Sequence, residues 1–244
     1  MELTVIGCWG GYPNKNEASS GYLLTHNGFN ILIDCGSGVL SKLQNFIQPE
    51  EIDALLLSHY HPDHNADIGV LYHARLIKGF LGTKPPELPI YAHNLDQKEF
   101  AKLTYKNITR GIAYHPNETL EVGPFKITFL QTVHPVPCFA MRFEVDGKAF
   151  VYTADTAYKD EFIDFGKEAD LLLCECNFYA NQSGKGAGHM NSFDAGTFAE
   201  AAGVKQLVLT HLPHYGQISL LAEEAKEKYN GPIQLAKEGL KITL

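Results

Sequence analysis

One six-residue segment of the chain carries four side chains that can bind a metal ion. They follow the apolar run Ala54–Leu57 and precede a helical pattern: His59, His61, Asp63 and His64. A loop between a strand and a helix can aim several side chains at one point. Imidazole and carboxylate groups together suit zinc and similar divalent cations. The segment therefore predicts a metal site after a buried strand, rather than a polar loop with incidental histidines.

The spacing within this segment indicates two ions rather than one. His59 and His61 are two residues apart, so both can face one ion from an extended loop. Asp63 and His64 then fall on the other side and can serve a second ion. Two ions share about seven or eight ligands, so further ligands must come from elsewhere. Three candidates stand at the ends of apolar runs: His134, Asp155 and His211. Each alone has an alternative role as a capping or buried hydrogen-bonded residue, but together they favour a dinuclear site.

Short β-branched runs alternate with helical patterns along the whole chain, and no linker or low-complexity stretch divides it. The runs that predict strands are Leu3–Ile6, Tyr22–Thr25, Asn30–Asp34, Ala54–Leu57, Lys126–Leu130, Ala140–Val145, Ala149–Thr153, Leu171–Cys174 and Leu207–Thr210. The patterns that predict helices are Val39–Phe46, His64–Lys78, Gln97–Tyr105, Phe193–Ala202 and Leu220–Tyr229. Patches with Pro and Gly predict surface loops at 82–89 and 184–188. This alternation predicts an α/β fold.

The two halves of the chain share a weak internal repeat. In the first half, a hairpin over 21–34 is followed by the run Asp53–His59; in the second, a hairpin over 139–155 is followed by Lys205–His211. Each half thus places a histidine directly after an apolar strand, although chance can produce the same pattern. Two β-rich halves with helices outside predict a single domain over residues 1–244. We expect a four-layer αββα sandwich with the site at the edge between the halves.

Charge and cysteine content limit the partners and the compartment. The chain has 20 Lys and Arg against 28 Asp and Glu, which gives a net charge of −8. Proteins that neutralise many phosphates usually carry a basic surplus, so an extended nucleic-acid surface is not favoured. Five cysteines without regular spacing make a poor disulfide framework, and no apolar run reaches the length of a membrane span. We expect a cytoplasmic protein with no membrane partner.

These residues resemble the signature of the metallo-β-lactamase superfamily, and more closely that of its ribonuclease Z (tRNA 3′-processing) and phosphodiesterase branch. The metal signature is His59-x-His61-x-Asp63-His64, followed by the three later candidates. Other segments that resemble this branch are Gly10–Pro13, Asp34–Gly38, His134–Arg142, Gly188–Ser192 and Lys205–His211. The resemblance covers nearly the whole chain and implies the metallo-β-lactamase sandwich.

The resemblance also implies how the ligands divide between two zinc ions, or manganese or iron in their place. One ion takes His59, His61 and His134. The other takes Asp63, His64 and His211, with Asp155 bridging the pair. A bridging aspartate in place of the cysteine of the zinc β-lactamases argues against lactam hydrolysis. Asp34 resembles an acid that orients a metal ligand, with a turn residue before glycine as the alternative.

Two ions held about 3.5–4 Å apart lower the pKa of a bridging water toward 7, which gives a hydroxide nucleophile. We expect Asp63 to serve catalysis as well as metal binding. The resemblance implies His189 as the acid that protonates the leaving group, whereas the alternative role is a polar residue at a helix start. Glu175 resembles the Glu of the branch's His-Glu-Ala-Thr segment, although Cys174 stands in place of the His.

One interval bears on the substrate. Ribonuclease Z carries a long tRNA-gripping arm between the positions that match His134 and Asp155, and here that interval is 21 residues, the length of a hairpin. RNA 3′ ends and small cyclic or linear phosphodiesters both remain candidate substrates. A thioester, lactone or sulfate-ester hydrolase would share every metal ligand. A metal-stabilised binding protein without enzymatic activity is the third hypothesis. The resemblance alone implies a homodimer.

Overall fold

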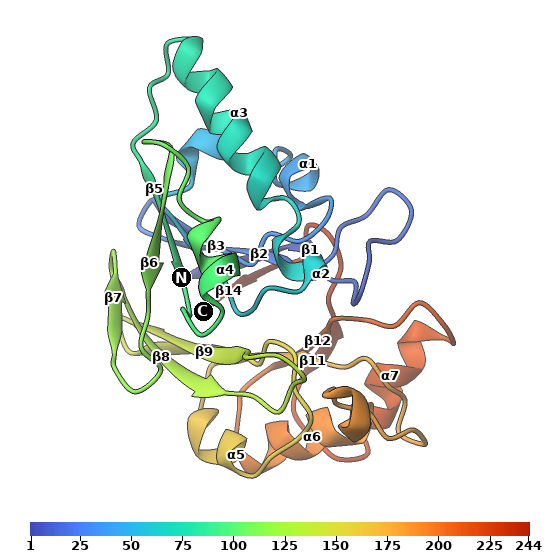
Figure 1. Ribbon diagram of the computed structural model, residues 1–244. Helices are drawn as coiled ribbons and strands as arrows, with labels where there is room; N and C mark the ends of the chain where they lie inside the picture. Colours follow the sequence, from blue (N-terminus) through green and yellow to red (C-terminus); the bar gives the residue numbers. More distant parts are fainter. The chain divides into compact units, whose positions relative to one another are not determined.

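The computed structural model describes residues 1–244 and divides them into two compact units (Figure 1). The first unit contains Met1–His115 and Lys237–Thr243, and the second contains Pro116–Ala236 and Leu244. Each unit is built around one seven-stranded sheet. The predicted α/β class is confirmed, because both sheets are mixed and both carry helices.

The sheet of the first unit is antiparallel at one side and parallel at the other. Its strand order is β14 (Lys241–Thr243), β1 (Glu2–Gly7), β2 (Gly21–His26), β3 (Phe29–Ile33), β4 (Ala54–Leu56), β5 (Leu88–Ala92) and β6 (Thr109–Ala113). The strands from β14 to β3 pair antiparallel, and those from β3 to β6 pair parallel. The carboxyl ends of β3 and β4 therefore lie at the same edge, where Ile33 is in register with Leu56.

The first unit contains four helices and one short 3-10 turn. They are α1 (Val39–Leu43), α2 (Pro62–Asn65), α3 (Ile68–Phe80), α4 (Gln97–Ala101) and the 3-10 turn η1 (Pro49–Glu51). Helices α1 and α3 bury apolar residues against the sheet of this unit. Leu43 of α1 and Leu71 of α3 share one core with Leu55 of β4. Arg75 of α3 is fully buried, and its guanidinium donates to the carbonyls of Pro49 and Pro86 at 2.7 Å each. These bonds compensate the cost of burying the charge.

The sheet of the second unit has the same mixed pattern. Its strand order is β13 (Ile233–Leu235), β12 (Leu207–Thr210), β11 (Leu171–Glu175), β10 (Lys148–Tyr152), β9 (Phe139–Val145), β8 (Phe125–Gln131) and β7 (Leu120–Val122). The strands from β10 to β13 pair parallel, and those from β7 to β10 pair antiparallel. The carboxyl ends of β10, β11 and β12 thus share one edge.

Three helices and one turn complete the second unit. They are α5 (Glu161–Phe165), the 3-10 turn η2 (Lys185–Ala187), α6 (Ser192–Ala201) and α7 (Ile218–Ala225). The central helix α6 packs on β11 and β12, and α5 and α7 pack on α6 (Figure 1). Asn191 caps α6 by accepting from the backbone N–H of Asp194, whose carboxylate accepts from the N–H of Asn191 in return. This reciprocal cap fixes the chain just after His189.

The predicted repeat is present, with one difference in alignment. In both sheets a hairpin, β2–β3 or β9–β10, is followed by parallel strands. The sequence repeat aligns the strand before His59 with the strand before His211. In the sheet, however, the parallel neighbour of β10 is β11, which ends in Glu175, and β12 lies one strand further out.

All nine predicted strands are present, with bounds that shift by one residue at most at either end. The predicted helix over 64–78 is instead two helices, α2 and α3, and the helix predicted to reach Tyr105 ends at Ala101. The sequence pattern does not indicate helix α5 or the five short strands β5, β6, β7, β13 and β14. Pro89 in β5 and Gly111 in β6 weaken the pattern of a strand, and the other three have three residues each.

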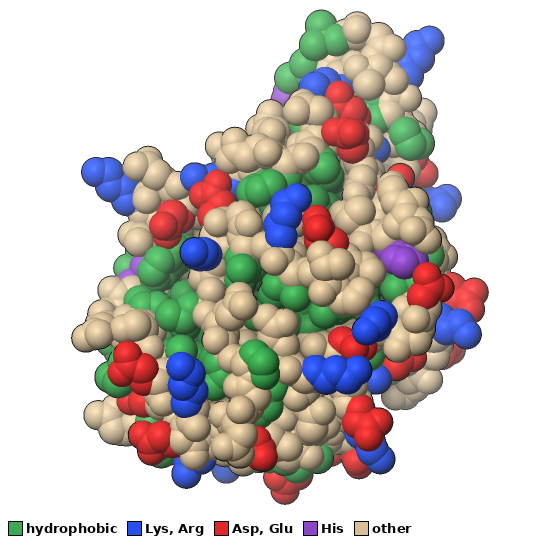
Figure 2. All heavy atoms as spheres, turned by 180° about the vertical axis from the view of Figure 1, so that it is seen from behind, with side chains coloured by type: hydrophobic (Ala, Val, Ile, Leu, Met, Phe, Trp, Pro, Cys, Tyr) green, Lys and Arg blue, Asp and Glu red, His purple; other side chains and the backbone are tan.

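No helix is long and apolar enough to cross a membrane. The five cysteines form no disulfide and are buried, as the sequence indicates. Burial, with smaller contributions from Glu17 and Glu238, raises the pKa of Cys8 to about 12. On the face drawn in Figure 2, Lys and Arg side chains are interspersed with Asp and Glu side chains rather than gathered in one stripe.

Candidate functional site

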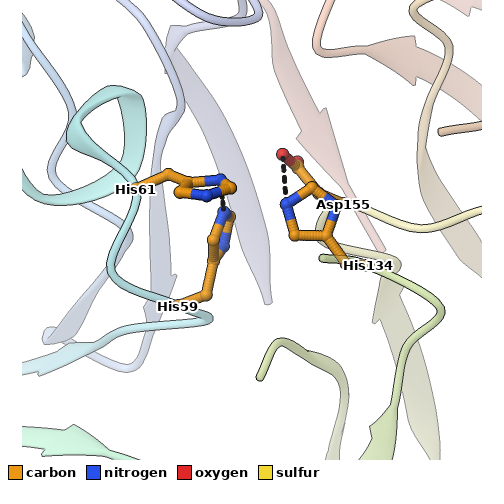
Figure 3. Close-up of side chains that lie close together, drawn as sticks. All are labelled: His59, His61, His134 and Asp155. Carbon is orange, nitrogen blue, oxygen red and sulfur yellow. Dashed lines mark hydrogen bonds and ion pairs between the residues drawn. The ribbon is translucent and has the colours of Figure 1, made fainter. Parts of the chain in front are cut away.

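The first unit places the histidine segment directly after β4 and in α2. Nε2 of His59 lies 3.1 Å from Nδ1 of His61, and Figure 3 shows this contact between two rings that meet edge to face. Oδ2 of Asp63 lies 3.5 Å from Nε2 of His64. The ring of His59 also lies 4.2 Å, between centroids, from that of His64, so the segment gathers all four side chains in one place.

A fully buried carboxylate holds this segment in place. Asp34 accepts hydrogen bonds from the backbone N–H and the hydroxyl of Ser58, at 2.8 Å each, and its Oδ2 lies 2.8 Å from Nδ1 of His64. With Nδ1 of His64 fixed in this way, Nε2 is the ring atom that can bind an ion. The geometry supports the orienting role that the resemblance implies for Asp34.

Two glycine-containing segments support the second pair of ligand atoms. The backbone N–H of Gly11 donates to Oδ2 of Asp63 at 2.7 Å, and that of Cys35 donates to the carbonyl of His64 at 2.7 Å. A Cβ atom on Gly36 would lie 1.9 Å from the carbonyl oxygen of Asp63, so only glycine permits this approach. The segments Gly10–Pro13 and Asp34–Gly38 therefore position α2.

The second unit brings three other candidates together at the carboxyl edge of its sheet. Oδ2 of Asp155 lies 3.3 Å from Nε2 of His211 and 3.9 Å from Nε2 of His134, the contact drawn in Figure 3. All three side chains are at most 5% exposed. Nδ1 of His134 lies 3.1 Å from the carbonyl oxygen of Gly188. One carboxylate oxygen of Asp155 therefore faces an imidazole nitrogen of each of the two histidines.

Three strand ends that carry site residues adopt a left-handed backbone. The φ angles are 55° at Asp34, 51° at Ala154, which precedes Asp155, and 52° at His211. Such conformations cost about 1–3 kcal/mol for residues other than glycine and concentrate at functional sites. At His211 the side chain of Asn177 donates to the backbone carbonyl at 2.9 Å, which helps to hold this conformation.

His189 lies beside this set and is held by Glu175. Oε1 of Glu175 lies 2.8 Å from Nδ1 of His189, and the ring of His189 stacks on that of His211 with centroids 5.1 Å apart. The side chain of Glu175 is 1% exposed, whereas that of His189 is 16% exposed. Because Nδ1 is engaged, Nε2 of His189 is the atom that can exchange a proton with a substrate.

Cys174, which stands where the resembling segment has a histidine, is a packing residue. Its Sγ lies 3.7 Å from Sδ of Met190, and burial raises the pKa of its thiol well above the usual range. Cys176 is equally buried. Both observations agree with a packing role at the end of β11, and they leave Glu175 free to face His189.

Some residues that support the site carry little signal in the sequence. Ser58, Thr156 and Asn177 all donate hydrogen bonds to Asp34, Glu175 or His211. Only Ser58 could have been linked to the site from the sequence, because it directly precedes the histidine segment. Arg142, the last residue of a segment that resembles the family, donates to the carbonyls of Phe165, at the end of α5, and of Lys167, at 3.1 Å each.

The second unit has two hollows of different kinds. The larger, about 870 Å³, lies where β10 and β11 begin and is lined by Arg142, Lys148 and Asp170 but by none of the candidate ligands. A smaller one, about 430 Å³, is lined in part by His189. The volume of a hollow therefore does not identify the site. The candidate ligands of this unit lie instead at the carboxyl edge of its sheet.

A family model described as "Beta-lactamase superfamily domain" matches residues 29–212. The probable metallo-hydrolase YhfI of Bacillus subtilis (strain 168) is 54% identical over 239 residues, which cover 98% of each chain. Ribonuclease Z of Methanopyrus kandleri is 24% identical over 283 residues and covers 99% of this chain and 97% of its own.

Solved structures show the same fold. The crystal structure of YhfI from Bacillus subtilis, described as a metallo-β-lactamase fold protein, matches with a TM-score of 0.98 and 52% identity over 99% of this chain and 98% of its own. The short form of human tRNase Z matches with a TM-score of 0.79 at 21% identity over 100% and 99% of the two chains. A diphosphatase of the PhnP family matches with a TM-score of 0.77 at 18% identity over 100% and 97%.

Proposed function

Because the chain belongs to the β-lactamase superfamily, we propose that it is a metal-dependent phosphodiesterase. The observation that carries this proposal is the pair formed by His189 and Glu175 beside His211. An alkoxide leaves a phosphodiester poorly unless it is protonated, and a fixed imidazole can supply that proton. The similarity to a probable metallo-hydrolase and to ribonuclease Z supports hydrolysis as the reaction class.

The donor set fits divalent metal ions. It combines imidazole nitrogens with carboxylate oxygens and contains no thiolate, which suits zinc and also manganese or iron. Asp34 engages Nδ1 of His64, and the carbonyl of Gly188 lies 3.1 Å from Nδ1 of His134. In both rings Nε2 faces a candidate ligand carboxylate and is the nitrogen that would bind an ion, and such outer hydrogen bonds are typical of metal-binding histidines.

Two ions share about seven or eight ligands, and neither unit alone offers that many. We assign one ion to His59, His61 and His134. We assign the other to Asp63, His64 and His211, with Asp155 shared by both ions. This assignment makes residues 1–244 one metallo-β-lactamase-like domain. A cytoplasmic location and a homodimer remain expectations from the sequence.

The chain's own residues would orient the substrate and move one proton. Divalent ions, when bound, lower the pKa of water toward neutrality and offset negative charge on phosphate oxygens. Nε2 of His189 donates its proton to the leaving oxygen. Glu175 holds Nδ1 of the same ring and stabilises its protonated form. Asp63, whose carboxylate accepts from the N–H of Gly11, would orient the attacking water as well as bind metal.

The hairpin formed by β9 and β10 limits the size of the substrates that we propose. Strands β9 and β10 are joined by the two-residue turn Asp146–Gly147, so nothing longer stands where the family resemblance expects a tRNA-gripping arm. With a net charge of −8, the chain suits RNA 3′ ends or small cyclic or linear phosphodiesters better than a folded tRNA.

The proposal is tested with bis(p-nitrophenyl) phosphate in the presence of Zn²⁺ or Mn²⁺. We expect turnover that falls about 100-fold or more in His189→Ala while elemental analysis shows the same metal content. His115→Ala, an exposed histidine in the first unit, is the matched control and should keep the wild-type rate. Absence of turnover with either ion would reject the proposal, and turnover of a thioester, lactone or sulfate ester instead would favour the alternative hydrolases.

A further inference from the structure

The smaller hollow of the second unit adjoins His189 and contains side chains that the metal site does not use. It is lined by Tyr158 on one side and by the loop between β11 and α6 on the other, through residues that include Asn181, Ser183 and Lys185. We call it the Lys185 pocket. Its volume of about 430 Å³ lies within the range of small-molecule sites.

The loop that forms this pocket is held by its own hydrogen bonds. Oε1 of Gln182 accepts from the N–H of Tyr179 and from the hydroxyl of Tyr215, at 3.0 Å each. The side chain of Asn191 donates to the carbonyl of Gln182 at 2.8 Å, and the N–H of His189 donates to the carbonyl of Gly184 at 3.1 Å. The pocket is therefore formed before any ligand binds.

Three polar side chains of the same loop have no such internal role. Asn181, Ser183 and Lys185 are exposed, and none of them makes a side-chain hydrogen bond or ion pair within the chain. Lys185 is the one Lys or Arg that lines the pocket. The one carboxylate there, Asp194, accepts from the N–H of Asn191 in the helix cap. The free groups offered to a ligand are thus an ammonium, an amide and a hydroxyl, together with the half-buried ring of Tyr158.

The position of His189 decides which part of a substrate this pocket can hold. During hydrolysis the water oxygen bonds to phosphorus, the bond from phosphorus to the leaving oxygen breaks, and His189 gives its proton to that oxygen. Water thereby supplies the hydroxyl of the new phosphomonoester, and the leaving group departs as an alcohol. Because His189 lines the pocket, we place the leaving group there.

Resting on the proposed phosphodiesterase function, we propose that the Lys185 pocket binds a nucleotide leaving group that carries a phosphate of its own. The ring of Tyr158 offers a face for a base, Asn181 and Ser183 offer hydrogen bonds, and Lys185 pairs with the additional phosphate. A cyclic mononucleotide has no such second phosphate, and its leaving oxygen stays on the same sugar. The pocket therefore favours linear oligonucleotides and terminally phosphorylated dinucleotides over cyclic mononucleotides.

The test compares hydrolysis of diadenylate with that of its 5′-phosphorylated and 3′-phosphorylated forms. We expect the wild type to hydrolyse one phosphorylated form with a kcat/KM about three- to fivefold above that of diadenylate, the scale of an exposed ion pair. In Lys185→Gln this ratio should fall to about one. Lys126→Gln, which makes the same charge change at an exposed position of β8 in the same unit, should keep the wild-type ratio.

Three results would overturn the inference: no preference in the wild type, a preference retained by Lys185→Gln, or faster hydrolysis of 2′,3′-cyclic AMP than of any diadenylate. Failure of the phosphodiesterase proposal itself has a different signature, because bis(p-nitrophenyl) phosphate would then not be hydrolysed at all.

Discussion

Oε1 of Glu175 lies 2.8 Å from Nδ1 of His189 and accepts at the same time from the backbone N–H of Thr156 at 2.9 Å. The carboxylate comes from the end of β11, and the imidazole comes from the loop before α6. A buried carboxylate in this position fixes the orientation of the ring and favours its protonated form. Glu175 thus acts through His189 rather than on the substrate.

Glu175→Gln should lower kcat about 10- to 100-fold, because the amide keeps the size of the side chain but carries no charge to stabilise the imidazolium. KM for bis(p-nitrophenyl) phosphate and the metal content should stay near wild-type values. Steady-state kinetics with elemental analysis measures both. An unchanged kcat would exclude the positioning role, whereas loss of metal would indicate a ligand role instead.

Asp34→Asn should weaken metal binding about 10- to 100-fold, because the amide cannot accept from both Ser58 and His64 as the carboxylate does. Asn tolerates the φ of 55° at this position, so the backbone is retained. Competition with a chelator measures the affinity. Asp53→Asn, at an exposed carboxylate that accepts from the N–H of Asn30, is the control. Equal chelator sensitivity in the two variants would contradict the orienting role.

Gly36→Ala should destabilise the protein by about 1–3 kcal/mol and reduce its metal content, because the new Cβ would displace the carbonyl of Asp63. Gly79→Ala is the matched control in α3, where a Cβ meets nothing within 4 Å. There the higher helix propensity of alanine should stabilise by up to about 1 kcal/mol. Urea unfolding compares the two, and equal effects would refute the close approach at Gly36.

Asp170→Asn should lower the melting temperature at pH 7 and have less effect at pH 3. Burial alone would raise the pKa of Asp170, but hydrogen bonds from Lys205, the N–H of Ala149 and Lys148 lower it further than burial raises it. A lowered folded-state pKa stabilises the fold above the unfolded value of about 3.9, and this stabilisation is lost as the pH falls through the folded pKa.

Thermal melts of the wild type and of Asp170→Asn at pH 7 and pH 3 measure whether the stabilisation by Asp170 is lost at low pH. The two melting temperatures should converge below about pH 4. A difference that stays constant or widens at pH 3 would show that the Lys205–Asp170–Lys148 contacts do not depress the pKa.

The parts of the site whose residues are neighbours in the sequence can be predicted from the sequence. Four ligand side chains within six positions after β4 need only one strand end and one turn to come together. The role of Asp34 could not be decided in this way, because it depends on the parallel pairing that brings the ends of β3 and β4 to one edge. Likewise, Glu175 meets His189 only because the loop after β11 folds back through the cap of α6.

The fold is least predictable where short strands pair over long distances in the chain. β14 has three residues and returns to pair with β1, with Leu3 opposite Ile242, which places this strand in the first unit. No alternation of apolar residues over three positions can signal such a partner. By contrast, the strands β1 to β4 and β8 to β12 lie in sequence runs of at least four residues whose apolar side chains are continuous or alternate, so these strands are evident from the sequence.

The most direct test of metal-dependent phosphodiester hydrolysis is a titration of the metal-stripped protein with Zn²⁺ or Mn²⁺, in which the rate on bis(p-nitrophenyl) phosphate and the bound metal are measured together. The assignment of His59, His61, Asp63, His64, His134, Asp155 and His211 predicts no turnover without metal, and a rate that rises until two ions are bound per chain. Turnover by the metal-free protein, or full metal loading without turnover, would contradict it.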